Sequence, residues 1–310
     1  MCSDRFRSPA PPDAAAHFEP HRRHLLAVAY RFLGSVSDAE DIVQETYLRW
    51  AGAERAAIQD TRAFLSRITA RLCLDQLKSA RVRRETYVGP WLPEPLVEAA
   101  GFSTSPASAS TDRADDVSIA LMLALERLSP LERAAFVLHD AFGQGFDEVA
   151  LALDRPAATC RQLAARARAH LRTDRARFKP SAGDGERFVQ AFQNAARSGD
   201  LAGLTRMLAT DAVMHSDSGG KVRAARRHIL GGDRIARFFA RLIPKKGAHR
   251  AERFVHINGL PGVLLRDARG VTETLAFEIH DGVITALYQT RNPDKLRHLA
   301  PLLPDTGEPS

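Results

Sequence analysis

The sequence has few cysteines and no long apolar run. The three cysteines, Cys2, Cys73 and Cys160, lie far apart, so they indicate neither a disulfide framework nor a metal site. The longest apolar run, Ile119 to Leu125, is far too short to span a membrane, which takes about 20 residues. The N-terminus is polar and rich in proline, and it lacks the apolar stretch that a secretory or lipoprotein signal needs. We therefore expect a cytoplasmic protein with no membrane segment.

Metal and cofactor sites are not indicated either. His17, His21 and His24 are spaced along one helical face, but no further group of ligands follows, so a solvated helix start is the better explanation. The 310 residues are 45 % hydrophobic and 26 % charged, as in a globular protein of two or three domains. The net charge of +7 permits a nucleic-acid partner without proving one.

The stretch from Ser129 to Arg172 predicts three helices. Ser129 followed by Glu132 is a capping box that opens the first helix. A glycine-containing break then leads to a short helix, Asp147 to Leu153, and Asp154 to Pro156 form a tight turn. The last helix is expected from Ala157 to about Arg172. Two short helices across a tight turn, the second of them basic, are typical of a helix-turn-helix.

The two sides of the last helix differ in character. One stripe is apolar and is expected to face the core: Cys160, Leu163, Ala164, Ala167 and Leu171. The other side is mostly basic: Arg161, Gln162, Ala165, Arg166, Arg168 and Arg172. From Arg155 to Lys179 there are eight Lys and Arg residues and one acidic residue. A basic helix face in the major groove would suit DNA, and a merely solvated basic helix stays open as the alternative.

The N-terminal part, from about Phe18 to Arg84, is also strongly helical. We expect a helix from Ser37 to about Trp50, opened by a second capping box of Ser37 and Glu40. Its polar face is acidic, which is either a helix-dipole effect or a docking face for a basic partner. A long basic helix from Arg62 to about Arg84 follows.

Two strings in this chain resemble one protein family. DAEDIVQETYLRW (Asp38 to Trp50) resembles region 2 of the extracytoplasmic-function sigma factors of bacterial RNA polymerase. The string from Leu125 to Leu171, LERLSPLERAAFVLHDAFGQGFDEVALALDRPAATCRQLAARARAHL, resembles region 4 of the same family. The resemblance implies an alternative sigma factor that binds the clamp and flap of core RNA polymerase and opens promoter DNA to initiate transcription. It implies helical domains over residues 18–85 (region 2) and 118–176 (region 4).

The same resemblance assigns roles to individual residues. Polymerase binding is expected at Asp38, Asp41, Gln44 and Glu45. Recognition of the minus-ten element is expected at Asp60, Thr61, Arg62, Arg67, Arg71 and Lys78. Aromatic side chains for base stacking are scarce there, and Phe64 is the nearest. Recognition of the minus-thirty-five element is expected at Arg155, Arg161, Gln162, Arg166, Arg168 and Arg172.

The remaining chain predicts a linker, residues 86–117, and an α+β domain, residues 183–300. Helices come first in this domain, and four period-2 strands follow, with a hairpin turn at Asp281-Gly282. The domain resembles the SnoaL-like domains of the nuclear-transport-factor-like cone fold. WLPEP (Trp91 to Pro95) and NPDKL (Asn292 to Leu296) stand as in one group of these sigma factors, and DSGGK (Asp217 to Lys221) replaces the DGGGK of that group.

That group implies regulation of the sigma core in cis by the C-terminal domain, with no separate anti-sigma factor. The contact is expected at Trp91, Leu92, Pro93, Glu94, Pro95, Asp217, Gly219, Gly220, Lys221, Asn292, Pro293, Asp294, Lys295 and Leu296. Within it, we expect Lys221 to meet Glu94. If the position of Ser218 requires a positive φ angle, its replacement of glycine has a conformational cost.

The SnoaL-like fold also houses cyclases and isomerases, so two alternatives stay open. They are an enzyme fused to a DNA-binding module, and a one-component repressor that responds to a ligand. Candidate pocket residues are His215, Asp217, His256, Glu278 and Tyr288, because a carboxylate beside a phenol suits proton transfer. A small-molecule ligand of this domain stays open, and we expect no catalytic activity.

Overall fold

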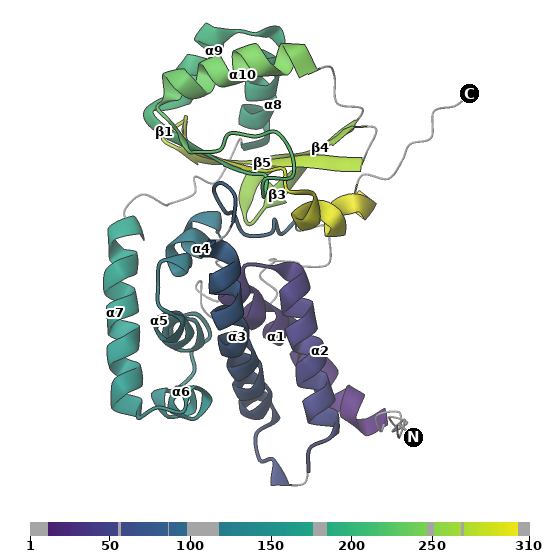
Figure 1. Ribbon diagram of the computed structural model, residues 1–310, viewed down its shortest axis with the longest axis vertical. Coiled ribbons are helices and arrows are strands. Elements are labelled where there is room, and N and C mark those ends of the chain that lie inside the picture. Colours follow the sequence, from purple (N-terminus) through teal and green to yellow (C-terminus); the bar gives the residue numbers. More distant parts are fainter. Residues whose placement is uncertain are drawn as a thin grey trace, which may run out of the picture. The chain divides into compact units, whose positions relative to one another are not determined.

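The computed structural model describes residues 12–54, 57–85, 87–97, 118–175, 185–246, 251–267 and 270–302 (Figure 1). The chain divides into two compact units. Unit 1 comprises Met1–Val82 and Glu126–Leu171, and unit 2 comprises Arg83–Leu125 and Arg172–Ser310. The start of the expected region 4, residues 118–125, therefore groups with unit 2. The expected linker beyond residue 97 lies outside the described residues.

The first part of unit 1 is built from three helices: α1 (Pro12–Leu33), α2 (Val36–Ala51) and α3 (Thr61–Glu85). Their core includes Phe18, Leu25, Val43, Trp50 and Leu65, all at most 2 % exposed. The indole nitrogen of Trp50 donates to the Ala14 carbonyl across 2.9 Å, which ties the end of α2 to the start of α1. The buried residues of α2 are Val36, Ala39, Ile42, Val43, Thr46 and Trp50.

The predicted cap of α2 was wrong by two residues. Gly34 ends α1 with a φ of 66°, and this turn leaves Ser35 in an extended conformation. The Ser35 hydroxyl then accepts the Asp38 amide across 3.1 Å, so Ser35 is the N-cap instead of Ser37. Both serines fit the sequence pattern, and the backbone of the turn decides between them.

His24 does not belong to a solvated helix start, contrary to our expectation. It is half-buried, and its ring packs edge-on against Phe142 with centroids 4.9 Å apart. Burial, with a smaller contribution from nearby Arg62, lowers the pKa of His24 to about 4. Within the described residues, no group of three or more His, Cys, Asp or Glu side chains is arranged to hold a metal ion.

The second part of unit 1 contains α5 (Pro130–Ala135), the π-helical turn η3 (Phe136–Ala141), α6 (Phe146–Leu153) and α7 (Ala157–Arg175). The predicted capping box is confirmed, since the Ser129 amide donates to Glu132 across 3.1 Å. Asp154 turns the chain between α6 and α7 with a φ of 53°. The buried Arg133 donates to the Phe32 carbonyl and to Glu126, both across 2.7 Å, and so fixes this part on α1.

Unit 2 is an α+β domain together with the segment before it. Its elements are α4 (Ile119–Glu126), α8 (Gly185–Ser198), α9 (Leu201–Met207), β1 (Leu208–Asp217), β2 (Ile229–Leu230), α10 (Gly232–Lys246), β3 (Ala251–Ile257), β4 (Leu260–Asp267), β5 (Gly270–His280), β6 (Val283–Thr290) and η4 (Pro293–Leu302). The strands form one sheet of order β2-β1-β6-β5-β4-β3, in which β1 and β6 run parallel. The predicted hairpin is confirmed, because Asp281 and Gly282 both have positive φ. The sequence did not predict β2 or η4.

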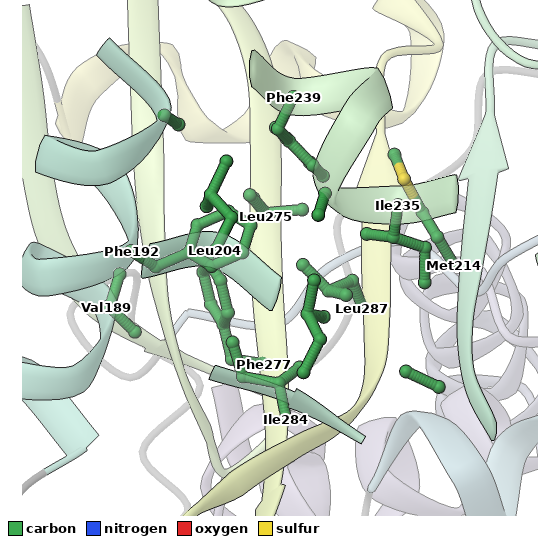
Figure 2. Close-up of a cluster of buried hydrophobic side chains, with 14 of the residues drawn as sticks. Val189, Phe192, Leu204, Met214, Ile235, Phe239, Leu275, Phe277, Ile284 and Leu287 are labelled. Carbon is green, nitrogen blue, oxygen red and sulfur yellow. The ribbon is translucent and has the colours of Figure 1, made fainter. Parts of the chain in front are cut away.

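The two faces of this sheet carry separate cores. Side chains of α8, α9 and α10 fill one face with an apolar cluster that includes Phe192, Phe239, Phe277 and Leu287 (Figure 2). The opposite face is covered by a second cluster, to which the linker contributes Leu92 and Val97, α4 contributes Ile119, and η4 contributes Leu296 and Leu299. The linker is therefore part of the folded domain.

Candidate functional site

The linker docks on a carboxylate at the end of β1. Asp217 is 0 % exposed and its two oxygens accept from both the linker and η4. The Tyr87 hydroxyl donates to Oδ1 across 2.5 Å, and the Leu92 amide donates to Oδ2 across 2.9 Å. Lys295 Nζ lies 2.8 Å from Oδ2 and completes an ion pair. One buried carboxylate thus joins two points of the linker to the C-terminal end of the domain.

Lys295 contributes the cationic half of this site. It is 7 % exposed, and its ammonium also donates to the Leu92 carbonyl. The same ammonium lies 4.5 Å from the ring centroid of Trp91 and 5.0 Å from that of Tyr87. Two aromatic faces and two oxygens therefore replace the water that the cation loses on burial. Burial, with the Asp217 carboxylate, raises the pKa of Tyr87 and keeps its phenol a donor.

The glycine loop after β1 must approach the linker closely. Gly219 and Gly220 have φ angles of 57° and 72°. A Cβ at Gly219 would lie 2.5 Å from Asn292 Nδ2, and a Cβ at Gly220 would lie 3.0 Å from the Val88 side chain. Glycine is thus required at both positions by conformation and by space. Ser218 is not among the positive-φ residues of the described chain, so replacing glycine there carries no such cost.

A second set of contacts holds the far end of the linker. The Leu96 amide donates to the side chain of Asn258 across 2.9 Å, and the Asn258 amide donates to the Leu96 carbonyl across 2.8 Å. Val97 forms an isolated antiparallel bridge with Ile257 at the end of edge strand β3. His298 Nε2 lies 2.9 Å from the Pro95 carbonyl. The linker is therefore fixed through its backbone at both ends.

The structure brings together most of the residues expected at this contact. They are Trp91, Leu92, Pro95, Asp217, Gly219, Gly220, Asn292, Lys295 and, in the neighbouring apolar cluster, Leu296. The expected partner of Lys221 was wrong, because its ammonium pairs with Asp294 and not with Glu94. Sequence reasoning missed Tyr87, Asn258 and His298. For Asn258 alone there was a local signal, since Asn-Gly marks a tight turn.

The five candidate pocket residues do not form one site. The Tyr288 hydroxyl donates to Glu278 across 2.8 Å, and His215 stacks on the Tyr288 ring with centroids 5.2 Å apart. Asp217 is engaged with the linker, and His256 is exposed on edge strand β3. The face of the sheet beneath α8, α9 and α10 carries an apolar cluster (Figure 2).

Burial shifts the titration of this second cluster. It raises the pKa of Glu278 to about 7, although the hydrogen bond from Tyr288 works in the opposite direction. It lowers the pKa of His215 to about 4, with a smaller contribution from His228. The buried carboxyl is therefore largely neutral below pH 7.

The expected polymerase-binding residues lie on the polar side of α2. Asp41 and Gln44 are exposed, and Asp38 and Glu45 are partly exposed. Asp38 accepts a long hydrogen bond of 3.4 Å from Gln76, and Glu45 pairs with Arg49 at 3.0 Å. The face therefore remains acidic and accessible on unit 1.

The expected minus-ten residues surround the start of α3. Asp60 caps this helix by accepting the Ala63 amide across 3.0 Å. A cleft of about 580 Å³ lies between the loop before α3 and helix α6, and its lining includes Ile58, Asp60, Phe64, Arg67, Glu148 and Leu151. Arg67 lies over the Phe64 ring at 5.3 Å. Thr61 is half-buried, Arg62 is exposed, and the side chain of Lys78 lies outside the described residues.

Arg71, one of the expected minus-ten residues, is hydrogen-bonded to the end of helix α6. Its guanidinium donates to the Leu151 carbonyl across 3.0 Å and weakly to the Ala152 carbonyl across 3.4 Å. These carbonyls lie in the last turn of α6, where helix C-termini leave acceptors without intrahelical partners. In this state Arg71 caps α6, which is a role the sequence did not predict.

The expected minus-thirty-five residues differ in accessibility. Arg155, Arg161, Gln162 and Arg166 are exposed along the turn and the outer side of α7. Cys160, Ala164, Ala167 and Leu171 are buried on the inner side, as predicted. Arg168 pairs with Asp140 across 2.7 Å, so it supports the packing of α7 on η3. The side chain of Arg172 lies outside the described residues.

Comparisons with known proteins show the family of this chain. The chain matches Sigma-70 region 2 over residues 17–83 and Sigma-70 region 4 over residues 118–171. It is 40 % identical to the ECF RNA polymerase sigma factor SigJ of Mycobacterium tuberculosis over 291 residues, which cover 90 % of this chain and 92 % of SigJ. The chain belongs to the extracytoplasmic-function sigma factors. As an alternative sigma factor it directs transcription initiation, with core RNA polymerase and promoter DNA as partners.

The similarity of this sigma factor to its relatives extends to the C-terminal domain. The crystal structure of Mycobacterium tuberculosis SigJ matches with a TM-score of 0.70 and 37 % identity, over 92 % of this chain and 98 % of that chain. A probable ECF sigma factor of the same species, SigI, is 34 % identical over 286 residues, which cover 91 % of this chain and 94 % of SigI. Sigma factors are not enzymes, so the alternative of a fused enzyme is not favoured. The matches to both sigma regions do not favour the alternative of a one-component repressor either. In the described part of the chain, no helix is long and apolar enough to cross a membrane.

Proposed function

We propose that docking of the linker on the SnoaL-like domain regulates this sigma factor in cis, without a separate anti-sigma factor. The observation that carries the proposal is the buried Asp217–Lys295 pair, which binds both the amide and the carbonyl of Leu92. A linker held at its backbone restricts the placements that regions 2 and 4 can adopt. The apparent affinity for polymerase scales with the fraction of the chain in a competent placement.

The contacts at this site are costly to break one at a time. Removing one partner of a buried ion pair costs about 3–5 kcal/mol, because the other charge is left without compensation. Each further buried hydrogen bond to the linker that is broken costs about 1–3 kcal/mol. Because linker and domain belong to one chain, the contact is intramolecular and does not depend on protein concentration.

The finer assignments of the sigma surfaces belong to the same proposal. The acidic face of α2, around Asp41 and Gln44, would bind the polymerase clamp, and region 4 would bind the flap. The exposed side of α7, with Arg161, Gln162 and Arg166, would enter the major groove at the minus-thirty-five element. The loop before α3 would take up the minus-ten strand. The exposure of these side chains supports the assignments.

An equilibrium titration with core polymerase tests the regulatory role. Lys295→Met keeps an apolar stem of similar length but removes the ammonium that binds Asp217 and Leu92, so the linker should be released. We expect the midpoint of the core titration to change by about tenfold or more, which corresponds to 1.4 kcal/mol. Arg297→Met is the matched control, because this side chain is 79 % exposed and pairs with Asp294 within the same turn of η4.

Limited proteolysis between residues 86 and 97 shows whether the linker has been released. A Lys295→Met chain that is cut faster in this segment, yet binds core polymerase with an unchanged midpoint, would contradict the proposal. A midpoint that changes equally in the Arg297→Met control would contradict it as well.

A further inference from the structure

The SnoaL-like domain carries a strongly basic surface that neither region 2 nor region 4 accounts for. Between Lys221 and Lys246 there are nine Lys and Arg residues and one acidic residue, Asp233. This excess is slightly larger than that of the stretch from Arg155 to Lys179, which contains α7. The chain as a whole has a net charge of only +7, so these two stretches hold its positive excess.

Three arginines form one stripe on the outer side of α10, which we call the α10 basic face: Arg234, Arg237 and Arg241. All three are exposed, while Ile235 and Phe239 on the opposite side of the helix are buried in the domain core (Figure 2). Their spacing of three and four residues places them side by side along about 10 Å of helix. The basic loop, Arg223 to His228, precedes α10 with Arg223, Arg226 and Arg227 exposed.

This arrangement is unfavourable for the domain alone. Like charges three and four residues apart repel one another on a helix, and Arg234 lies in the first turn, where the helix dipole is already positive. The only acidic residue of the helix, Asp233, is 3.6 Å from Arg237, and the two side chains are 66 % and 55 % exposed. An anionic partner on this face would relieve the repulsion.

The chemistry of the α10 basic face favours phosphate groups of duplex DNA. Arginine presents a planar fork that matches phosphate oxygens, and all three side chains of the α10 basic face are arginines. From Gly232 to Ile243, the exposed positions are Asp233 and the three arginines, while Phe238, Leu242 and Ile243 are partly buried. The exposed surface is therefore charged, which suits phosphate groups better than stacked bases or a membrane interface. We propose that the α10 basic face, together with the basic loop, binds the backbone of duplex DNA without sequence preference.

The salt dependence of DNA binding tests this directly. The full-length chain is titrated with a short duplex of scrambled sequence over a series of potassium chloride concentrations, and anisotropy gives the binding constant. Each lost phosphate contact lowers the slope of log K against log salt by about 0.9. For Arg234→Gln/Arg237→Gln/Arg241→Gln we therefore expect the slope to fall by about two to three. The loop is left unchanged because Arg226 lies next to the docked linker.

Matched variants separate a specific surface from general charge. Arg187→Gln/Arg197→Gln/Arg206→Gln removes the same charge from α8 and α9 and should keep the wild-type slope. Arg234→Lys/Arg237→Lys/Arg241→Lys retains the charge and should keep most of the slope. An unchanged slope in the α10 glutamine variant, or an equal fall in the α8 and α9 variant, would overturn the proposal. Binding to vesicles containing phosphatidylserine that is lost in the α10 variant, with an unchanged DNA slope, would overturn it in favour of a membrane.

Discussion

At the scale of single residues, the buried Asp217 shows how one carboxylate organises a whole contact. It has no exposed surface, yet donors from Tyr87, Leu92, Lys295 and the Gly219 amide satisfy its oxygens. A buried charge with this many partners tolerates substitution poorly, because each partner would also lose its acceptor. The site therefore links the conformation of the linker to the stability of the domain.

Also at the scale of single residues, the buried Glu278 should make the stability of the domain depend on pH. Its pKa is raised from 4.5 to about 7 by burial, so the folded chain binds a proton that the unfolded chain has released. Stability from this group is therefore full below about pH 4.5 and is lost as the pH rises to 7. At pH 8, we expect Glu278→Gln to be more stable than the wild type by about 3 kcal/mol, and at pH 4.5 the two should differ little.

Urea unfolding at several pH values measures this difference. His215 titrates in the opposite sense, since its pKa is lowered to about 4, but it is present in both chains and cancels from the comparison. Glu186→Gln on α8 is a matched control, because this glutamate is exposed. A difference between Glu278→Gln and the wild type that does not depend on pH would contradict the assignment.

At the scale of the element, α7 divides its arginines between two tasks. Arg161 and Arg166 are exposed on its outer side, while Arg168 is paired with the nearly buried Asp140. We expect Arg161→Ala and Arg166→Ala to weaken binding of the minus-thirty-five element by about 1–3 kcal/mol each, with relaxed specificity at one base pair. We expect Arg168→Ala to lower the stability of unit 1 instead, since Asp140 would lose its partner.

Footprinting with base-substituted promoters and thermal unfolding distinguish the two tasks. An unchanged base preference in Arg161→Ala and Arg166→Ala would show that another side of α7 faces DNA. An Arg168→Ala chain that is fully stable but has lost promoter specificity would show that Arg168 leaves Asp140 and contacts DNA in the complex.

The sequence predicted most elements of this fold but few of its long-range contacts. Periodicity and capping residues were enough for α5, α6 and α7, because these signals lie within a few residues of one another. Local patterns could not choose between Ser35 and Ser37, since the φ of Gly34 decides the cap. They could not find Tyr87 either, because its partner Asp217 is 130 residues away. The pairing of Lys221 with Asp294 was missed for the same reason.

At the scale of the whole molecule, the chain combines a sigma core with a domain that binds its own linker. The region 2 and region 4 matches end at residue 171, and the linker is held by residues within the SnoaL-like domain, from Asp217 to His298. In the proposed regulation, release or capture of the eleven residues 87–97 is the step through which the domain acts on transcription. Trp91 on the linker and Lys295 on η4 are in contact, so a substitution of either residue should disturb the docking of the linker.

Run-off transcription at a fixed concentration of core polymerase tests this account most directly. We expect promoter-dependent transcripts from the wild type and none from Asp38→Lys/Asp41→Lys. Asp41 is exposed, and Asp38 is partly exposed and accepts a long hydrogen bond from Gln76, so both charges should contribute little stability. Lys295→Met and Trp91→Ala should each change the amount of transcript without changing the start site. The double variant should resemble a single one, because both remove one contact. Transcript levels in Lys295→Met, Trp91→Ala and the double variant that all equal the wild type would contradict the account.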